Sequence, residues 1–303
     1  MSSLDTTIGA LRLPSPVLTA SGTAGHGDEL ADYGNLADLG AVVVKSLSDF
    51  PWPGNEPPRV TASGAHMVNA VGLAGPGVAA WRERDLVALR QRGARVVGSL
   101  WGRTVGEFAD AAAAMRGADV VAVEVNVSCP NLERSREMFA HSPSATGAVV
   151  SAVRFLDRPL WVKLSPNTPR LLDVARAAID AGADALVLVN TVMGMVIDVE
   201  RRRAALGNGA GGVSGPGILP IAVRAVYDCY QEFRATPIIG VGGVTCGEDA
   251  VSMIMAGACA VEVGTATFAN PRAPWRVQRE LAAWLNHHHV ERVSEIVGAA
   301  HRG

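Results

Sequence analysis

The sequence predicts an α/β fold, a (β/α)8 TIM barrel formed by one domain over residues 1–303, because eight short apolar runs alternate with helix-length amphipathic segments. The runs are almost continuously apolar, which is typical of parallel strands buried on both faces. Four of them are preceded by a similar phrase, read as LGA, RGAD, AGAD and AGAC. A glycine that ends a helix before a strand is an expected stop signal, so this recurrence indicates a degenerate repeat of strand and helix.

The predicted elements follow one another at the spacing of a barrel. The strands are Pro16–Ala20, Ala41–Lys45, Arg95–Leu100, Val120–Val127, Leu160–Leu164, Ala185–Asn190, Pro237–Val241 and Ala260–Gly264. The helices between them include Gly77–Gln91, Thr104–Met115, Pro169–Ala181, Leu219–Phe233 and Glu248–Ala256. An open doubly wound sheet is the alternative, disfavoured because no Gly-x-Gly-x-x-Gly motif follows the first strand.

Three segments depart from the regular repeat. Within residues 1–15, Thr6–Leu13 is expected to form a small hairpin at the barrel floor. Segments 46–71 and 191–217, which follow the second and sixth strands, are longer than ordinary connections. Loops that follow barrel strands lie at the C-terminal face, where barrel enzymes have their active sites, so both segments are predicted to be active-site insertions.

Composition argues against several other classes of protein. The net charge of -2 gives no reason to expect a nucleic acid or an acidic membrane surface as a partner. No run approaches the roughly 18 apolar residues of a spanning helix, and the first residues lack a signal-peptide core. The four cysteines form no CxxC pair, so reduced thiols in a cytoplasmic protein are predicted. No metal site is expected, and His287–His289 is interpreted as a solvated helix end.

Only two of the 27 basic residues are lysines, and both lie near predicted strand ends. Lys45 ends the second strand and Lys163 lies near the end of the fifth. A lysine in a chain that otherwise uses arginine indicates a position where the wide guanidinium fork would not fit, although chance is the alternative. Both ammonium groups are therefore expected at one rim of the barrel.

Glycines at the ends of the last two strands predict a phosphate site. Gly240–Gly243 ends the seventh strand and Gly264–Thr265 ends the eighth. Backbone amides beside glycine form a ready anion site, and barrels frequently bind phosphate with these two loops. Glycines that serve only tight turns are the alternative, and the site alone does not distinguish a flavin from a sugar phosphate.

Cys129 is the cysteine with the strongest case for reactivity. It follows the fourth strand and precedes Pro130, with polar neighbours on both sides. A thiol with a reference pKa near ~8.5 can act as a base where its surroundings favour the thiolate. The alternative is a small buried side chain, the interpretation given to Cys229 and Cys259.

Several asparagines are expected to converge on the same rim as the lysines. They are Asn69, Asn126, Asn131 and Asn190. An amide offers two donors and an acceptor without adding charge, which suits a flat ligand that alternates carbonyl and NH groups. Ordinary loop-capping asparagine is the alternative.

Together these segments resemble the dihydroorotate dehydrogenases, in the family's order from residue 16 to about residue 268. The matching segments are PVLTASGTAG (16–25), VVVKS (42–46), GNEPPR (54–59), MVNAVGL (67–73), VEVNVSCPN (123–131), VKLSPN (162–167), VNTVMGMVID (189–198), GGVSGPG (211–217), IIGVGG (238–243) and VGTA (263–266). Any one of these motifs is weak, but the conjunction is highly specific.

The resemblance implies FMN as cofactor and assigns residues to it. The implied cofactor residues are Ala20, Ser21, Gly22, Lys45, Ser46, Ser99, Asn126, Lys163, Val189, Gly215, Gly242, Gly243, Gly264 and Thr265. The implied substrate residues are Lys45, Asn69, Ala70, Val71, Gly72, Leu73, Asn126, Asn131, Asn190 and Thr191. By resemblance, Cys129 removes the C5 proton of dihydroorotate while C6 delivers hydride to flavin N5, and Lys163 stabilises negative charge on the reduced flavin.

The same resemblance implies a subtype and its partners. Cysteine at position 129 and the segments 189–198 and 211–217 look like the NAD-linked, soluble class. Members of that class pair with a separate subunit that carries FAD and an iron–sulfur cluster, so a homodimer or a heterotetramer is expected. The alternatives are a related FMN barrel acting on another dihydropyrimidine or a specialised-metabolism substrate, and a non-redox, phosphate-binding barrel lyase or isomerase that uses Lys163 as a Schiff base.

Three departures from the family pattern bear on the substrate. Residues 73–76 read Leu-Ala-Gly-Pro, without the family's asparagine. Ser99 replaces an asparagine usual near the flavin, and Trp101 stands where a small residue is usual. The loop 132–140 is charged and poor in glycine, which predicts slower closure or a reshaped pocket.

Overall fold

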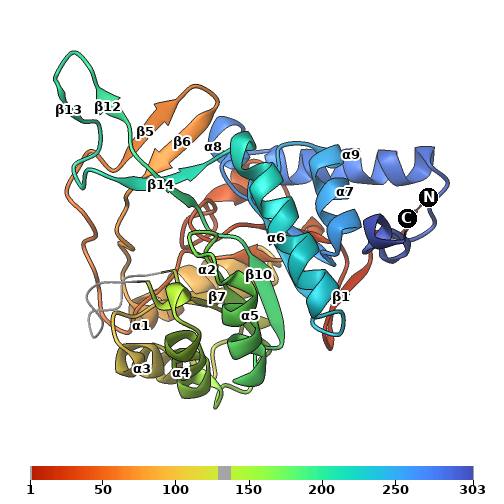
Figure 1. Ribbon diagram of the computed structural model, residues 1–303. Coiled ribbons are helices and arrows are strands. Elements are labelled where there is room, and N and C mark those ends of the chain that lie inside the picture. The colour runs from red at the N-terminus through yellow and green to blue at the C-terminus, as the bar shows by residue number, and fades with distance from the viewer. Residues whose placement is uncertain (1, 129–137, 303) are drawn as a thin grey trace.

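The computed structural model, which describes residues 2–128 and 138–302, is a closed barrel of eight parallel strands surrounded by helices (Figure 1). The barrel strands are β3 (Val17–Thr19), β4 (Val42–Val43), β7 (Val96–Leu100), β8 (Ala122–Asn126), β9 (Leu160–Lys163), β10 (Ala185–Leu188), β15 (Ile238–Val241) and β16 (Ala260–Val263). Each pairs in parallel with its neighbours, and β16 closes the barrel on β3. The predicted TIM barrel and its eight strands are therefore confirmed.

Several strands are shorter than predicted, most of all β4. The amide of Lys45 donates to the carbonyl of Gly25, outside the barrel ladder, so the regular pairing ends before this residue. Its side chain is consequently carried at the mouth of the barrel rather than within the wall.

Helices cover the outside of the barrel. They are α1 (Val78–Glu83), α2 (Asp85–Gln91), α3 (Val105–Met115), α4 (Pro143–Val153), α5 (Leu171–Asp180), α6 (Leu219–Glu232), α7 (Gly247–Ala256), α8 (Ala266–Ala269) and α9 (Ala273–His287). The predicted segment 77–91 is divided at Arg84 into α1 and α2, and the connection between β3 and β4 contains only the short 3-10 turns Glu29–Asp32 and Leu36–Asp38. Thr104 begins α3 as predicted, because its hydroxyl accepts the amide of Glu107.

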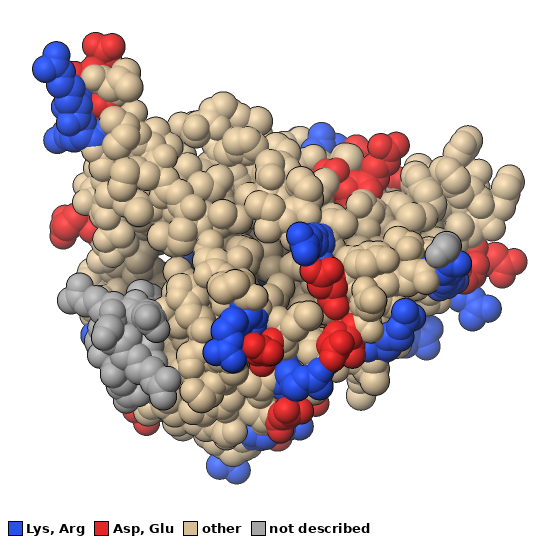
Figure 2. Space-filling model, in the orientation of Figure 1, with Lys and Arg blue, Asp and Glu red and all other residues tan. Residues whose placement is uncertain are grey.

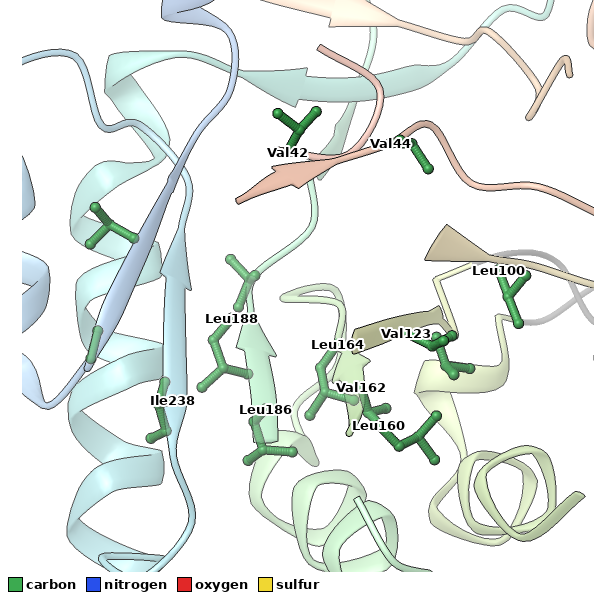
Figure 3. Packing of buried hydrophobic residues seen from close by; sticks show 14 of the residues in the cluster. Val42, Val44, Leu100, Val123, Leu160, Val162, Leu164, Leu186, Leu188 and Ile238 are labelled. Carbon is green, nitrogen blue, oxygen red and sulfur yellow. The ribbon is translucent and has the colours of Figure 1, made fainter. Parts of the chain in front are cut away.

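The side chains of each barrel strand alternate between two cores. Leu160, Val162 and Leu164 point from β9 and its end toward the helices, beside Leu186 and Leu188 of β10 (Figure 3). Trp161 belongs instead to the core inside the barrel. The alternation follows from the two-residue period of a strand, and it places Lys163 on the inner side as well.

A hairpin of β1 (Thr6–Ile8) and β2 (Leu11–Leu13) lies at the N-terminal ends of the barrel strands. Ile8 and Leu13 are fully buried in the inner core, and the Thr6 hydroxyl donates to the carbonyl of Cys259, the residue before β16. The hairpin therefore fills the end of the barrel opposite to Lys45.

The two long insertions pair with each other instead of forming irregular loops. Their strands β5 (Val60–Ser63), β6 (His66–Asn69), β11 (Val192–Gly194) and β14 (Gly211–Ser214) form an antiparallel sheet in the order β11-β14-β6-β5. Pairing across the insertions satisfies backbone groups that separate loops would leave to solvent.

A second hairpin, of β12 (Ile197–Asp198) and β13 (Arg203–Ala204), projects from this sheet (Figure 1). Basic side chains gather at the end of the projection, and Figure 2 shows them in blue beside acidic ones. Arg201, Arg202 and Arg203 are all exposed there, as expected for a solvated loop.

Candidate active site

A cleft of about 350 Å³ opens at the C-terminal ends of the barrel strands. The strand ends line one side, and the sheet made by the two insertions lines the other through Val60, Met67, Asn69 and Met193. This volume is within the range of small-molecule sites, and its place is where barrel enzymes carry their chemistry.

Most residues predicted from the sequence come together in this cleft. The predicted cofactor residues that line it are Ala20, Ser21, Gly22, Lys45, Ser46, Asn126, Lys163, Val189, Gly242, Gly243, Gly264 and Thr265. The predicted substrate residues that line it are Lys45, Asn69, Ala70, Val71, Gly72, Leu73, Asn126, Asn190 and Thr191. Their binding roles stay predictions, but their convergence on one cleft is a property of the fold.

Two of the predicted residues that the structure describes do not belong to the lining, and two others cannot be placed. Ser99 is buried behind Ser46, and Gly215 begins the short turn Pro216–Ile218. Cys129 and Asn131 lie outside the described residues, although Ser128 lines the cleft.

Hydroxyl and amide groups form a continuous network across the cleft wall. The Ser46 hydroxyl lies 2.9 Å from that of Ser99 and 3.3 Å from that of Ser21. Asn126 donates to Ser46 over 3.3 Å, and Asn190 donates to the Asn126 side-chain oxygen over 3.3 Å. The network joins groups that lie in or just after five different strands, so each amide is held in a fixed orientation.

Lys163 lies between two buried carboxylates. Its Nζ donates to Oε2 of Glu262 over 2.9 Å and lies 3.6 Å from Oε2 of Glu124. Burial opposes the charged form of Lys163, but Glu124 and Glu262 outweigh it and raise its pKa. Burial, opposed by Lys163 and reinforced by Glu124, raises the pKa of Glu262 to about 8. The two carboxylates therefore favour the charged form of Lys163, whereas burial and Glu124 favour the protonated form of Glu262.

Lys45 lies against the backbone of Gly22 at the same mouth. A Cβ at Gly22 would lie 3.1 Å from Cδ and 3.2 Å from Nζ of Lys45, and the φ of Gly22 is +86°. Burial and the positive charge of Lys163 lower the pKa of Lys45 to about 8. Two ammonium groups therefore face the same cleft. The ammonium group of Lys45 loses its proton at a lower pH than an ordinary lysine does.

The glycines after β15 meet a steric requirement. Gly242 and Gly243 have φ of +127° and +80°, a region that favours glycine. A Cβ at Gly243 would lie 2.6 Å from the backbone nitrogen of Leu219 at the start of α6. The chain can therefore approach α6 here only because no side chain intervenes.

Trp101 fills the space beside the first insertion. Its ring lies 6.1 Å from those of Phe50 and Trp52 in edge-to-face geometry, and the Trp52 indole donates to the carbonyl of Gly72. The large side chain at position 101 thus supports the insertion from behind instead of entering the cleft.

Glu124 and Glu262 were not predicted from the sequence. Each is the one charged residue within a run that reads VEV, inside a strand expected to be buried on both faces. A carboxylate in such a strand needs a buried partner, and this signal could have identified both residues.

Fold and cleft together define a class of enzyme, a TIM barrel whose C-terminal mouth combines anion-binding glycines with ammonium and amide groups. A family model described as dihydroorotate dehydrogenase matches residues 3–285. The chain belongs to the dihydroorotate dehydrogenase family, a family of oxidoreductases. The non-redox lyase or isomerase alternative is therefore set aside.

Individual relatives match over nearly the whole chain. A protein of Desulforudis audaxviator named dihydroorotate dehydrogenase B (NAD(+)), catalytic subunit is 48% identical, over 97% of this chain and 96% of its own. One of the same name from Alkaliphilus oremlandii is 41% identical, over 96% of each chain. A relative from Aquifex aeolicus with an A-type (fumarate) name is also 41% identical, over 96% of each chain. Within the described parts of this chain, no helix has both the length and the apolar character needed to span a membrane.

Proposed function

We propose that the chain oxidises dihydroorotate to orotate with FMN as cofactor, in pyrimidine biosynthesis in the cytoplasm. One observation carries the proposal: both lysines of the chain and the amides of Asn126 and Asn190 face one cleft beside the glycine turns after β15 and β16. The family to which the chain belongs supports the same reaction.

The lining of the cleft fits FMN. Gly242, Gly243, Gly264 and Thr265 follow the last two strands, where backbone amides can hold a phosphate. Lys163, fixed between two carboxylates, presents the ammonium group suited to the pyrimidine edge of the flavin. When bound, FMN supplies the acceptor for the hydride that leaves C6 of the substrate.

The opposite rim fits an anionic pyrimidine. Lys45 offers a positive charge for the substrate carboxylate, and the network through Asn126 and Asn190 offers donors and acceptors to the ring. Asn69 and Thr191 come from the two insertions and complete this rim. Asn131 is proposed as a further substrate contact.

Cys129 is proposed as the base that removes the C5 proton. Support comes from Ser128, which lines the cleft directly before it, and from Asn126, whose side-chain oxygen accepts the Ser128 amide over 3.1 Å. Removal of the C5 proton requires a base held within reach of the substrate, so positioning contributes much of the catalysis.

Anaerobic mixing with dihydroorotate, followed by flavin absorbance, tests the reaction and the base. We expect the purified protein to be yellow, dihydroorotate to bleach the flavin, and dihydrouracil to bleach it far more slowly. Cys129→Ser should bind FMN normally and be reduced at least 100-fold more slowly at neutral pH, in the range of lost acid–base catalysis. Unchanged rates in Cys129→Ser would remove the residue from the base role, and faster bleaching by dihydrouracil would favour a related dihydropyrimidine enzyme.

The names of the NAD-linked relatives support a partner for this chain. We propose that it acts with a separate subunit carrying FAD and an iron–sulfur cluster, as a homodimer of catalytic chains or a heterotetramer. The chain alone is then expected to be reduced by dihydroorotate without reducing NAD. Direct reduction of NAD by the isolated chain would contradict the partnership.

A further inference from the structure

Three ionisable groups meet inside the barrel just below the cleft. Glu124 comes from β8, Lys163 from β9 and Glu262 from β16, and both carboxylates have no exposed surface. Of the three, only Lys163 lines the cleft. The two carboxylates therefore influence a ligand in the cleft through Lys163, which lies between them and the cleft.

Burying two carboxylates beside one ammonium group costs free energy. Two carboxylates share one ammonium group, and within the described residues Oε1 of Glu262 has no hydrogen-bond partner. A buried carboxylate beyond the number needed for neutrality is expensive, and an apolar side chain would serve packing as well. Such a group just below a cleft points to a functional role.

We propose that Glu262 is a positioning residue that holds the Lys163 ammonium at the cleft floor and thereby sets how strongly the site stabilises negative charge on the bound flavin. The inference rests on the proposed function, since it assumes FMN in the cleft. A charged Glu262 offsets the lysine and weakens that stabilisation, whereas a protonated Glu262 leaves more positive charge facing the cleft.

The proton on Glu262 links this effect to pH. Burial and Glu124 raise its pKa to about 8 against the opposing influence of Lys163. The strands that flank Glu262 face it with Val241 and Leu18, which do not titrate. Lys45, which follows β4, interacts electrostatically with Lys163. Among the described residues, Lys163, Glu124 and Lys45 are therefore the ionisable groups to consider.

The decisive measurement is the midpoint potential of bound FMN in wild type and in Glu262→Gln, between pH 6 and pH 9. At pH 9 the variant should favour the reduced flavin at least tenfold more than wild type, a shift of about 30 mV for a two-electron couple. At pH 6, where wild-type Glu262 holds a proton, the two potentials should agree. Lys45 titrates in both proteins, so the difference between them isolates Glu262.

Asp184→Asn is the matched control. Asp184 accepts the amide of Leu160 at the far end of the strand that carries Lys163, and its half-exposed carboxylate is screened by solvent. This variant should have wild-type potentials throughout. Equal potentials of Glu262→Gln and wild type at pH 9, or a shift that is independent of pH, would overturn the inference.

Two further outcomes are distinguishable. Wild type that folds but cannot be reconstituted with FMN would overturn the proposed function and this inference with it, whereas a flavin-loaded wild type isolates the question of Glu262. If Glu262→Gln does not fold, Glu262→Met keeps a similar volume and should reproduce the shift at pH 9. Failure of both variants to fold would assign Glu262 a purely structural role and reject the proposal.

Discussion

Asn69 of β6 lies directly opposite Gly212 of β14, and its side-chain amide donates to the Gly212 carbonyl over 3.3 Å. The pair joins the insertion that follows β4 to the insertion that follows β10. Because both insertions line the cleft, the shape of the substrate rim depends on this contact.

Gly212→Ala is expected to raise the KM for dihydroorotate at least tenfold with a smaller effect on FMN binding. A Cβ at this position would collide with the side chain of Thr191, so the Thr191 rim must move. Steady-state kinetics and flavin titration measure the two effects. Gly147→Ala in α4, where a Cβ would meet only ordinary contacts at 3.6 Å, is the control and should behave as wild type. An unchanged KM in Gly212→Ala would show that Thr191 does not shape the substrate rim.

Binding of orotate, the anionic product, is expected to weaken above about pH 8. The pKa of Lys45 is lowered to about 8, mainly by burial, so the ammonium group is lost as pH rises through this value. Each further pH unit approaches a tenfold loss of affinity if the charged form is required. Titrations that follow the flavin spectrum from pH 7 to pH 10 measure the trend.

Lys45→Gln supplies the comparison for this titration. It should bind orotate weakly at pH 7, and its affinity should change less between pH 7 and pH 10. A full wild-type slope in the variant would assign the titration to another group.

The effect of Lys45 on folding stability has the opposite dependence on pH. The unfolded chain binds more protons than the folded one between about pH 8 and the usual lysine pKa of 10.5, so Lys45 makes the free energy of unfolding rise with pH in that window.

The barrel was predictable because its strands carry a local signal, whereas the sheet of the insertions was not. Continuous apolar runs mark β8 and β9 from the sequence alone. The segments that form β6 and β14 are short, contain glycine and polar residues, and pair across more than 140 positions, as between Asn69 and Gly212. No local pattern specifies such a partner.

The candidate site shows the same division. Lys45, Lys163 and the asparagines could be predicted because strand ends converge in any parallel barrel. The contact between Glu262 and Lys163 could not be predicted, because it joins positions 99 residues apart across the barrel interior. The pKa of Lys45 likewise depends on its burial against Gly22, which only the folded chain shows.

Ile8→Ala and Leu13→Ala are expected to lower the free energy of unfolding by about 2–5 kcal/mol each, since both side chains are buried in the core inside the barrel. Urea unfolding followed by circular dichroism measures the loss. Arg12→Ala, in the same hairpin but exposed, should change stability by no more than about 0.5 kcal/mol. If the hairpin only touched the barrel surface, substitutions of Ile8, Leu13 and Arg12 would all have small effects on the free energy of unfolding.

Lys163→Met is expected to lower the free energy of unfolding of the flavin-free protein by about 3–5 kcal/mol at pH 8, because it leaves Glu124 and Glu262 buried without a counter-ion. The direction in which this loss of stability changes with pH follows from proton binding. Burial already raises the pKa of Glu262 against the opposing influence of Lys163, so without the ammonium group the folded variant binds more protons than the unfolded chain and regains stability as pH falls. Urea unfolding at pH 8 and pH 5.5 should therefore show a smaller gap between variant and wild type at the lower pH. A gap that is equal at both values would mean that lost packing, rather than unpaired charge, causes the destabilisation.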